Sequence, residues 1–289
     1  LGYWTHLARV LERGLFDGIF LADVLGTYDV YEGSDAAAVR RAVQVPINDP
    51  MLVIPAMAAV TEHLGFGVTA TLSYEPPYTF ARRMSTLDHL TRGRIGWNVV
   101  TGYLASAARA AGERTQRGHD DRYDLADEYM QAVYRLWETS WEDGAVLRDR
   151  QSGRYADPAK LHRVQFEGRR YKVDALHLAE PSPQRTPVLY QAGASKRGRQ
   201  FAATHAECVF LAELSTSSLT ATVAVGQSWL GRVLDALGRP IDNGPPIDDL
   251  ENCPLDPPTM NPLRRGIQLG QQLRHSLAEL CDPCFLDSP

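Results

Sequence analysis

Several features with functional meaning are rare or missing in this chain of 289 residues. No apolar run approaches the roughly 18 residues of a membrane-spanning helix, and the first residues do not resemble a signal peptide. We therefore expect a cytoplasmic protein without a membrane partner. Four cysteines are too few for a disulfide framework. A net charge of −5 argues against nucleic acid as a partner.

Motifs for nucleotides and metals are missing as well. Neither the phosphate-binding motif G-x-x-x-x-G-K-[ST] nor the dinucleotide motif G-x-G-x-x-G occurs in the chain. Cys281-Asp-Pro-Cys284 is a single C-x-x-C without a second pair or a histidine cluster, and no other set of metal ligands is visible. The sequence therefore predicts neither nucleotide hydrolysis nor a bound metal.

What the chain does contain is a regular alternation of strand-like and helix-like segments. Such alternation calls for a parallel sheet, and with this many repeats it predicts an α/β fold of the (β/α)8 TIM-barrel type. The predicted strands are 16–23, 65–71, 95–101, 186–192 and one that starts at 208; the predicted helices are 3–13, 51–64, 79–90, 119–137 and 199–205.

The alternation is too short for a complete barrel. A barrel takes roughly 250 residues, and only about 210 here fit the pattern. We therefore expect residues 1–213 to form an incomplete barrel, with strands two to six present and the first strand and the last two missing. Residues 141–178 interrupt the alternation, and a long insertion of this kind is usually a lid or a binding loop.

Residues 214–289 differ in character from the preceding chain. Six prolines between positions 245 and 262 disfavour regular structure, so we expect an irregular, weakly folded tail of different origin. Residues 218–267, including GRVLDALGRPID and NPLRR, resemble the segment ahead of the catalytic domain in flagellar and type III secretion ATPases. Because the phosphate-binding motif is missing, no ATPase activity is expected.

Polar residues stand out in the segment from 92 to 137. Asn98 lies inside a strand-like apolar run, where a buried amide must bond to its neighbours or meet a ligand. His119 and Tyr123 are four residues apart at a helix start and therefore share one face. They either present an imidazole and a phenol to a ligand, or serve as a helix cap and a core aromatic.

Further candidates lie where predicted strands end, which is where barrel active sites are built. Asp23 ends the first predicted strand, and Thr69 lies in the second. Cap or structural roles are the alternatives for both. Ser195 follows a strand and precedes a helix, whose free N–H groups would bind phosphate with added donors from the serine and Arg197. A plain turn would also contain glycine and serine there.

Two of these segments carry a family resemblance. The sequences GWNVVT and HDDRYDLADEYMQAVYRLWETSWED resemble the flavin-dependent monooxygenases of the bacterial-luciferase superfamily, in the branch of nitrilotriacetate and dibenzothiophene-sulfone monooxygenases. The likeness runs from about Tyr3 to Phe210, and Gly102 stands where that branch usually has serine. The resemblance implies a luciferase-like barrel. It also implies that six residues contact FMN: Asp23, Thr69, Asn98, His119, Tyr123 and Ser195. Of these, Ser195 would lie at the phosphate.

The resemblance also implies a reaction. A separate NAD(P)H:flavin reductase would supply reduced FMN, which reacts with O2 to give a C4a-(hydro)peroxide that must be kept dry and transfers one oxygen atom to a small organic substrate. No catalytic residue is assigned. Tyr28, Tyr31, Tyr74 and the 141–178 insertion would line the substrate pocket.

Two other functions stay open. One is a luciferase-like oxidoreductase that uses the deazaflavin F420 in place of FMN. The other is an inert, incomplete barrel that acts only by association, because an open parallel sheet leaves unpaired edges that favour a homo-oligomer.

Overall fold

The computed structural model describes residues 1–210, 222–225 and 251–254 of the chain. The chain divides into two compact units, Leu1–Ala212 and Glu213–Pro289. In the second unit, β10 (Thr222–Val225) and β11 (Glu251–Pro254) pair in antiparallel fashion, and β11 lies within the proline-rich stretch where the sequence disfavours regular structure. The rest of the predicted tail, with its C-x-x-C motif, lies outside the described residues.

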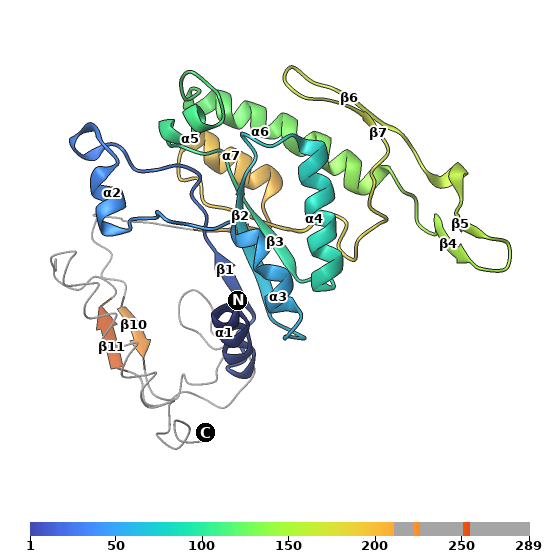
Figure 1. Cartoon of the computed structure of the whole chain (residues 1–289), viewed down its shortest axis with the longest axis horizontal. Helices are drawn as coiled ribbons and strands as arrows, with labels where there is room; N and C mark the ends of the chain where they lie inside the picture. Colours follow the sequence, from blue (N-terminus) through green and yellow to red (C-terminus); the bar gives the residue numbers. More distant parts are fainter. Residues whose placement is uncertain (211–221, 226–250, 255–289) are drawn as a thin grey trace. The chain divides into compact units, whose positions relative to one another are not determined.

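The first unit is built on a five-stranded sheet in the order β1-β2-β3-β8-β9 (Figure 1). Every pair of neighbours runs parallel, so the prediction from the alternating pattern is confirmed. The strands follow one another across the sheet in chain order, as they do in the wall of a β/α barrel. Their bounds are β1 Gly18–Leu21, β2 Gly65–Thr71, β3 Ile95–Val100, β8 Val188–Gln191 and β9 Cys208–Val209.

Four of the five predicted helices are present: α1 precedes the first strand, and α4, α6 and α7 lie in the connections between strands. The exception is 51–64, which is wrong as a single helix. A 3-10 turn, η2, and a short helix, α3, replace it, and Pro55, the second residue of α3, has no N–H to continue a helix from η2. The helices are α1 Gly2–Arg13, α3 Ile54–Ala58, α4 Pro77–Thr91, α6 His119–Tyr134 and α7 Lys196–His205; η2 is Pro50–Leu52, and the π-helical turn η3, Arg135–Thr139, extends α6.

Two stretches for which no helix is predicted contain short helices. These are α2 (Ala36–Arg41) and α5 (Ala105–Ala110), and a 3-10 turn, η1 (Tyr31–Gly33), precedes the first of them. Both helices are rich in alanine, the residue with the highest helix propensity, but at six residues each they are too short to show a repeating apolar face.

Residues 141–178 form two antiparallel hairpins outside the main sheet. In Figure 1 they extend away from the sheet beyond α4. The first hairpin pairs β4 (Val146–Asp149) with β5 (Arg154–Ala156), and the second pairs β6 (Val164–Glu167) with β7 (Lys172–Ala175); the 3-10 turn η4 (Pro158–Lys160) lies between them.

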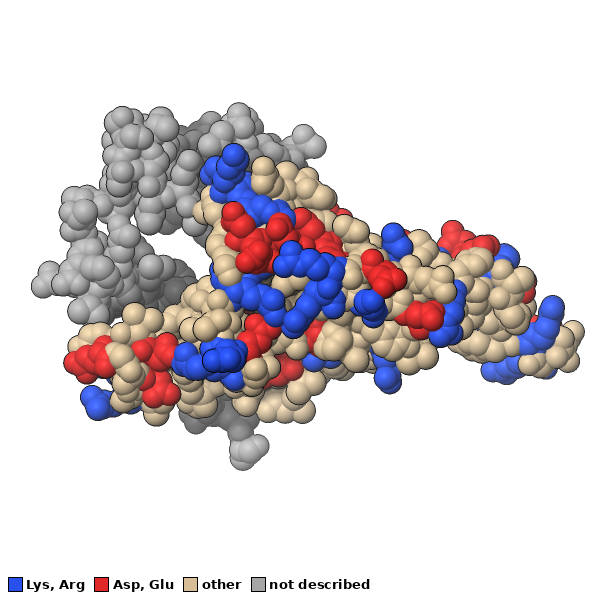
Figure 2. All heavy atoms as spheres, turned by 90° about the horizontal axis from the view of Figure 1, so that it is seen from above, with Lys and Arg blue, Asp and Glu red and all other residues tan. Residues whose placement is uncertain are grey.

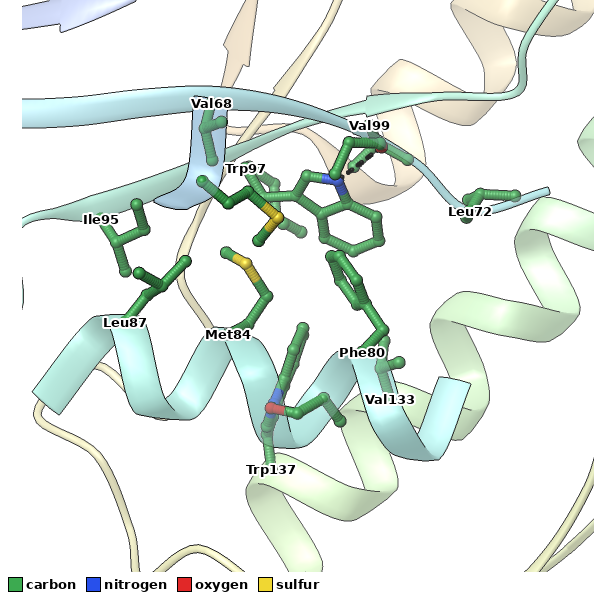
Figure 3. Close-up of a cluster of buried hydrophobic side chains, with 14 of the residues drawn as sticks. Val68, Leu72, Phe80, Met84, Leu87, Ile95, Trp97, Val99, Val133 and Trp137 are labelled. Atoms are coloured by element: carbon green, nitrogen blue, oxygen red, sulfur yellow. Dashed lines mark hydrogen bonds between the residues drawn. The ribbon is translucent and has the colours of Figure 1, made fainter. Parts of the chain in front are cut away.

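The hydrophobic core lies between the sheet and helices α4 and α6. Side chains alternate along a strand, so Ile95, Trp97 and Val99 of β3 point toward α4 (Figure 3). The Trp97 ring is fully buried, and its centroid lies 4.4 Å from that of Phe80 on α4. The indole Nε1 of Trp97 donates to the Ala70 carbonyl of β2 at 2.9 Å, which ties the two central strands together.

The opposite face of the sheet carries small and polar residues. Gly67 and Gly96 are register partners there, and an added Cβ would lie 3.0 Å from the Phe20 ring at the first and 2.5 Å from the Tyr190 ring at the second. The two glycines therefore leave room for aromatic rings over the middle of the sheet. Asn98 has the same strand parity as Gly96, so it belongs to this inner face.

Where the insertion returns toward the sheet, His177 is buried, with 3% of its surface exposed. Its Nε2 lies 3.0 Å from the Ser85 hydroxyl, and its Nδ1 is buried without a partner among the described residues. Burial, with a smaller effect of nearby His89, lowers the pKa of His177 to about 4 from 6.5. The folded protein therefore holds this imidazole in its neutral form.

The lowered pKa of His177 predicts a loss of stability in acid. Because the folded pKa lies below the unfolded one, the stabilisation is present above about pH 6.5 and lost as the pH falls through 4. A shift of this size corresponds to about 3 kcal/mol at most. In urea unfolding between pH 7 and 4, His177→Gln should lose less stability than the wild type by this amount. His162→Gln, at an exposed histidine, should follow the wild type. Parallel curves for wild type and His177→Gln would contradict the prediction.

Candidate functional site

An open cavity of about 340 Å³ lies at the carboxyl ends of β1 and β2. Thr69 and Thr71 line it from β2 and Asp23 from just after β1. Ile47, Asn48, Asp49, Met51 and Tyr74 line it from the segments that follow. A second cavity of about 90 Å³ shares Asp23, Thr71 and Tyr74 with the first. Both lie at the edge of the sheet where β/α barrels build their active sites.

Carboxylates make the larger cavity acidic. Burial, together with the nearby Asp49 carboxylate, raises the pKa of Asp23 above its usual value. Burial likewise raises the pKa of Glu75, although the Arg83 guanidinium opposes the shift. Asp23 follows the end of β1 by two residues, so its carboxylate reaches the cavity from the strand end, as the sequence predicts.

Thr69 and Asn98 form a direct pair on the inner face of the sheet. They are register partners in β2 and β3, and the Asn98 Nδ2 donates to the Thr69 Oγ1 at 2.9 Å. Only 6% of Asn98 is exposed, and its Oδ1 has no partner among the described residues. A buried acceptor of this kind is costly unless something donates to it. The pair can therefore accept a hydrogen bond from a ligand N–H.

A second polar group lies where β8 meets α6 and α7. Tyr123 is 7% exposed, and its hydroxyl accepts from the Gln191 Nε2 at 3.3 Å. The Gln191 Oε1 accepts from the Gly193 N–H at 2.6 Å. A Cβ on Gly193 would lie 2.6 Å from the Tyr123 hydroxyl, and one on Gly198 2.9 Å from it. Glycine is required at both positions because the phenol approaches the backbone this closely.

Ser195 is the N-cap of α7. Its Oγ accepts from the Gly198 N–H at 2.9 Å, which leaves its own proton and the first N–H groups of the helix to face an anion. The turn interpretation of Ser195 and the phosphate interpretation are thus compatible. The Arg197 guanidinium is already paired with Asp124 at 2.9 Å and with Asp127 at 2.5 Å, so its role as an added phosphate donor stays a prediction.

His119 is the first residue of α6, and its ring centroid lies 5.1 Å from that of Tyr123. The N-cap is Gly118, and no side chain caps this helix, so the alternative role of His119 as a cap is wrong. The half-exposed imidazole instead has its Nδ1 2.7 Å from the Asp120 carboxylate. Tyr123 does pack in the core, against Phe201, while its hydroxyl stays in the polar group.

The six predicted residues therefore fall into two groups along the carboxyl edge of the sheet. Asp23, Thr69 and Asn98 belong to β1–β3, and His119, Tyr123 and Ser195 to the α6–β8–α7 corner. Sequence reasoning missed Gln191, which is 4% exposed and joins the phenol to the glycine turn. A polar residue at the end of the apolar strand Val-Leu-Tyr-Gln is the signal that was available.

Among residues 1–210 and the two described tail strands, no group of three His, Cys, Asp or Glu side chains is placed to hold a metal ion. The same part of the chain contains no helix long and apolar enough to cross a membrane. The polar groups do fit FMN. A helix N-terminus, a serine and a phenol can bind its phosphate, and an unpaired buried amide oxygen can accept from a ring N–H.

A parallel β/α wall with polar strand ends is the framework of a TIM-barrel enzyme. The chain belongs to the luciferase-like monooxygenase family, which matches residues 1–225. This confirms the family resemblance found in the sequence.

Two relatives show the extent of the similarity. The chain is 61% identical over 211 residues to the long-chain alkane monooxygenase of Geobacillus thermodenitrificans. The aligned region covers 73% of this chain and 48% of that protein. The chain is 59% identical over 217 residues to the dimethyl-sulfide monooxygenase of Hyphomicrobium sulfonivorans, covering 75% and 45%. The chain thus spans about half the length of the curated relatives it matches.

Solved structures agree with the fold. The crystal structure of long-chain alkane monooxygenase superposes with a TM-score of 0.71 at 60% identity, over 73% of this chain and 48% of that one. Riboflavin lyase, solved with modified FMN and riboflavin, superposes with a TM-score of 0.70 at 47% identity, over 73% and 47%. The five parallel strands are therefore a half-barrel of the luciferase-like type, which confirms the fold predicted from the sequence.

Proposed function

We propose that this chain carries the flavin site of a two-component monooxygenase, which uses reduced FMN and O2 to insert one oxygen atom into a small organic substrate. The proposal rests on one observation: two polar groups with complementary hydrogen-bonding character lie at the same edge of the sheet. One offers donors for a phosphate at Ser195 and Tyr123, and the other an unpaired acceptor at Asn98. FMN presents both an anionic phosphate and ring N–H groups.

Each residue has a defined task in this proposal. The first turn of α7, with the Ser195 and Tyr123 hydroxyls and the nearby His119 imidazole, would bind the phosphate. Asn98, held by Thr69, would orient the ring through its Oδ1, and Asp23 would border it from the end of β1. Bound reduced FMN would supply the electrons and the activation of O2. A separate NAD(P)H:flavin reductase would deliver it, since the chain has no dinucleotide motif.

The smaller cavity favours a neutral substrate. Its lining is largely apolar, from Val24, Leu25, Val100 and Leu104, beside the rings of Tyr74 and Tyr103. Two of the relatives are named for long-chain alkanes and dimethyl sulfide, both of which are apolar. We therefore propose a small or slender apolar substrate, which would enter next to the flavin and help to keep the site free of water.

Anaerobic titration with reduced FMN tests the proposal. The wild type should saturate at micromolar concentrations, and Asn98→Leu should bind roughly ten times more weakly, because one buried hydrogen bond is lost. Thr101→Val is the matched control: it also replaces a buried polar residue, at the end of the same strand, and should bind as the wild type. Absence of saturable binding to the wild type would refute the flavin site. Tighter binding of reduced F420 in the same assay would favour the deazaflavin alternative.

A further inference from the structure

The smaller cavity of the candidate site has room for only a short molecule. Its volume is about 90 Å³. An apolar cavity of about 150 Å³ holds one benzene molecule, so by volume this one holds a molecule of roughly three or four non-hydrogen atoms. A longer chain could enter only if one wall of the cavity were displaced.

Leu25 and Tyr103 form the wall of this cavity that faces solvent. Both line the cavity, and 50% of Leu25 and 59% of Tyr103 is exposed. The other lining residues are buried or half-buried. A side chain that lines a cavity while most of its surface is exposed lies between that cavity and solvent. The larger and more rigid of the two side chains is the Tyr103 ring, which therefore sets how far a bound molecule can extend outward.

Tyr28 holds the Tyr103 ring in this position. The two hydroxyls are hydrogen-bonded to each other, and the ring centroids lie 6.4 Å apart. Tyr28 belongs to the loop after β1, and Tyr103 to the loop between β3 and α5. The Tyr103 ring can therefore turn away from the cavity only by breaking a bond to a separate part of the chain.

The segment that carries Tyr28 is itself fixed on α5. The Ser106 Oγ on this helix donates to the Thr27 carbonyl at 2.7 Å. Gly26 lies so close to the helix that an added Cβ would be 2.8 Å from the Ser106 Oγ. Its φ of +123° also favours glycine. The backbone next to Tyr28 is thus held against the start of α5 by a hydrogen bond and a close contact.

An ion pair adds little to this attachment. Arg109 and Asp29 lie 2.6 Å apart, but the Arg109 side chain is largely exposed, and exposed ion pairs contribute little to stability. Figure 2 looks onto the α5–α6 side of Figure 1 and shows basic side chains lying directly beside acidic ones on that face. Such pairs are common there, so the contacts of Gly26 and Thr27 are the ones that position Tyr28.

We propose that Tyr103, held by Tyr28, limits the length of the substrate, so that the site takes an apolar molecule of roughly three or four non-hydrogen atoms and excludes a longer chain. This inference rests on the proposed function, because it assigns the smaller cavity to the substrate. Methylene groups beyond that length would have to displace the Tyr103 ring. Without the ring they would increase affinity, about fourfold for each methylene group that becomes buried.

Two thioethers of different length test this inference. The full chain, saturated with reduced FMN under anaerobic conditions, is titrated in a calorimeter with dimethyl sulfide and with dibutyl sulfide. The wild type should bind dimethyl sulfide more tightly than dibutyl sulfide. In Tyr103→Ala the ratio of the two affinities should shift by at least about tenfold toward dibutyl sulfide, which corresponds to about two additional buried methylene groups.

Two conservative variants test the role of Tyr28. Tyr28→Phe and Tyr103→Phe remove the same hydrogen bond and keep both rings. Each should shift the affinity ratio in the same direction and by the same amount, and less than Tyr103→Ala does. A merely structural role of Tyr28 would lower the melting temperature and leave the ratio unchanged. Tyr3→Ala removes a tyrosine of α1 that is 70% exposed, and as the control it should keep the wild-type ratio.

The inference fails if the wild type prefers dibutyl sulfide. It fails equally if Tyr103→Ala melts cooperatively, binds reduced FMN and keeps the wild-type ratio. Unchanged ratios in both phenylalanine variants would remove Tyr28 from the proposal. Absence of FMN binding to the wild type is a separate result, which appears before any thioether is added and counts against the proposed function. The same titrations without flavin would then measure the length limit of the cavity.

Discussion

Exchange of Ser195 for aspartate is expected to lower the affinity for reduced FMN by at least about 100-fold while leaving the protein as stable as the wild type. Aspartate is as good an N-cap as serine, so α7 should keep its cap and lose less than about 0.5 kcal/mol. The new carboxylate would face the phosphate dianion, and two like charges near 4 Å apart repel by a few kcal/mol, about 4 at an effective dielectric constant of 20.

The comparison of two flavins makes this prediction specific. Riboflavin lacks the phosphate, so its reduced form should bind Ser195→Asp and the wild type with similar affinity in anaerobic titrations. Ser195→Asn keeps a neutral cap and should lose far less FMN affinity than the aspartate variant. Equal FMN affinity in Ser195→Asp and the wild type would show that the phosphate does not bind at the start of α7.

The largest expected loss of stability follows from Trp97→Ala. The side chain is fully buried between β3 and the helices, in contact with the rings of Phe80, Tyr129 and Trp137. Its removal leaves a large cavity and takes away the hydrogen bond to the Ala70 carbonyl, at a total cost of about 3–5 kcal/mol or more. The melting temperature should fall by roughly 10 °C or more, or the chain should fail to fold.

Denaturant unfolding of two further variants distinguishes the loss of core packing from the effect of removing any aromatic ring. Trp97→Phe keeps a ring in the core and should lose clearly less stability than Trp97→Ala, although it also loses the bond to Ala70. Tyr3→Ala removes an aromatic ring that is 70% exposed, and it should change stability by no more than about 0.5 kcal/mol. Equal losses in Trp97→Ala and Tyr3→Ala would contradict the proposed core.

The strands of the main sheet were more predictable than the helices, for a local reason, whereas the four short strands of the insertion were not predicted. The apolar stretch Gly65–Thr71 matches β2 to the residue, because a buried parallel strand reads as a nearly continuous apolar run bounded by turns. The helix expected at 51–64 fails because Pro55 has no N–H to join η2 and α3 into one helix, and α2 and α5 are too short for a helical repeat to be visible.

Asn98 and Ser195 show how far the site could be predicted. A polar residue in a buried strand and a serine ahead of a helix are both local signals, and both side chains occupy the predicted positions. Their partners are not local: Asn98 bonds to Thr69, 29 residues away, and Ser195 lies beside Tyr123, from another helix. Their roles toward FMN stay predictions until the titrations above are made, as does a different origin of residues 214–289.

The sequence by itself determined the class of fold, the family and the residue types at the strand ends. These signals are local, because strand and helix periods and family motifs depend on residues that are close together in the chain. Tertiary structure alone decided which of those residues work together. The sequence suggests Arg197 as a phosphate donor, but α7 packs on α6, where Arg197 forms ion pairs with two aspartates. The Asn98 Oδ1 likewise becomes an unsatisfied acceptor only because the folded sheet buries it, since an unsatisfied polar group costs free energy only once it is buried.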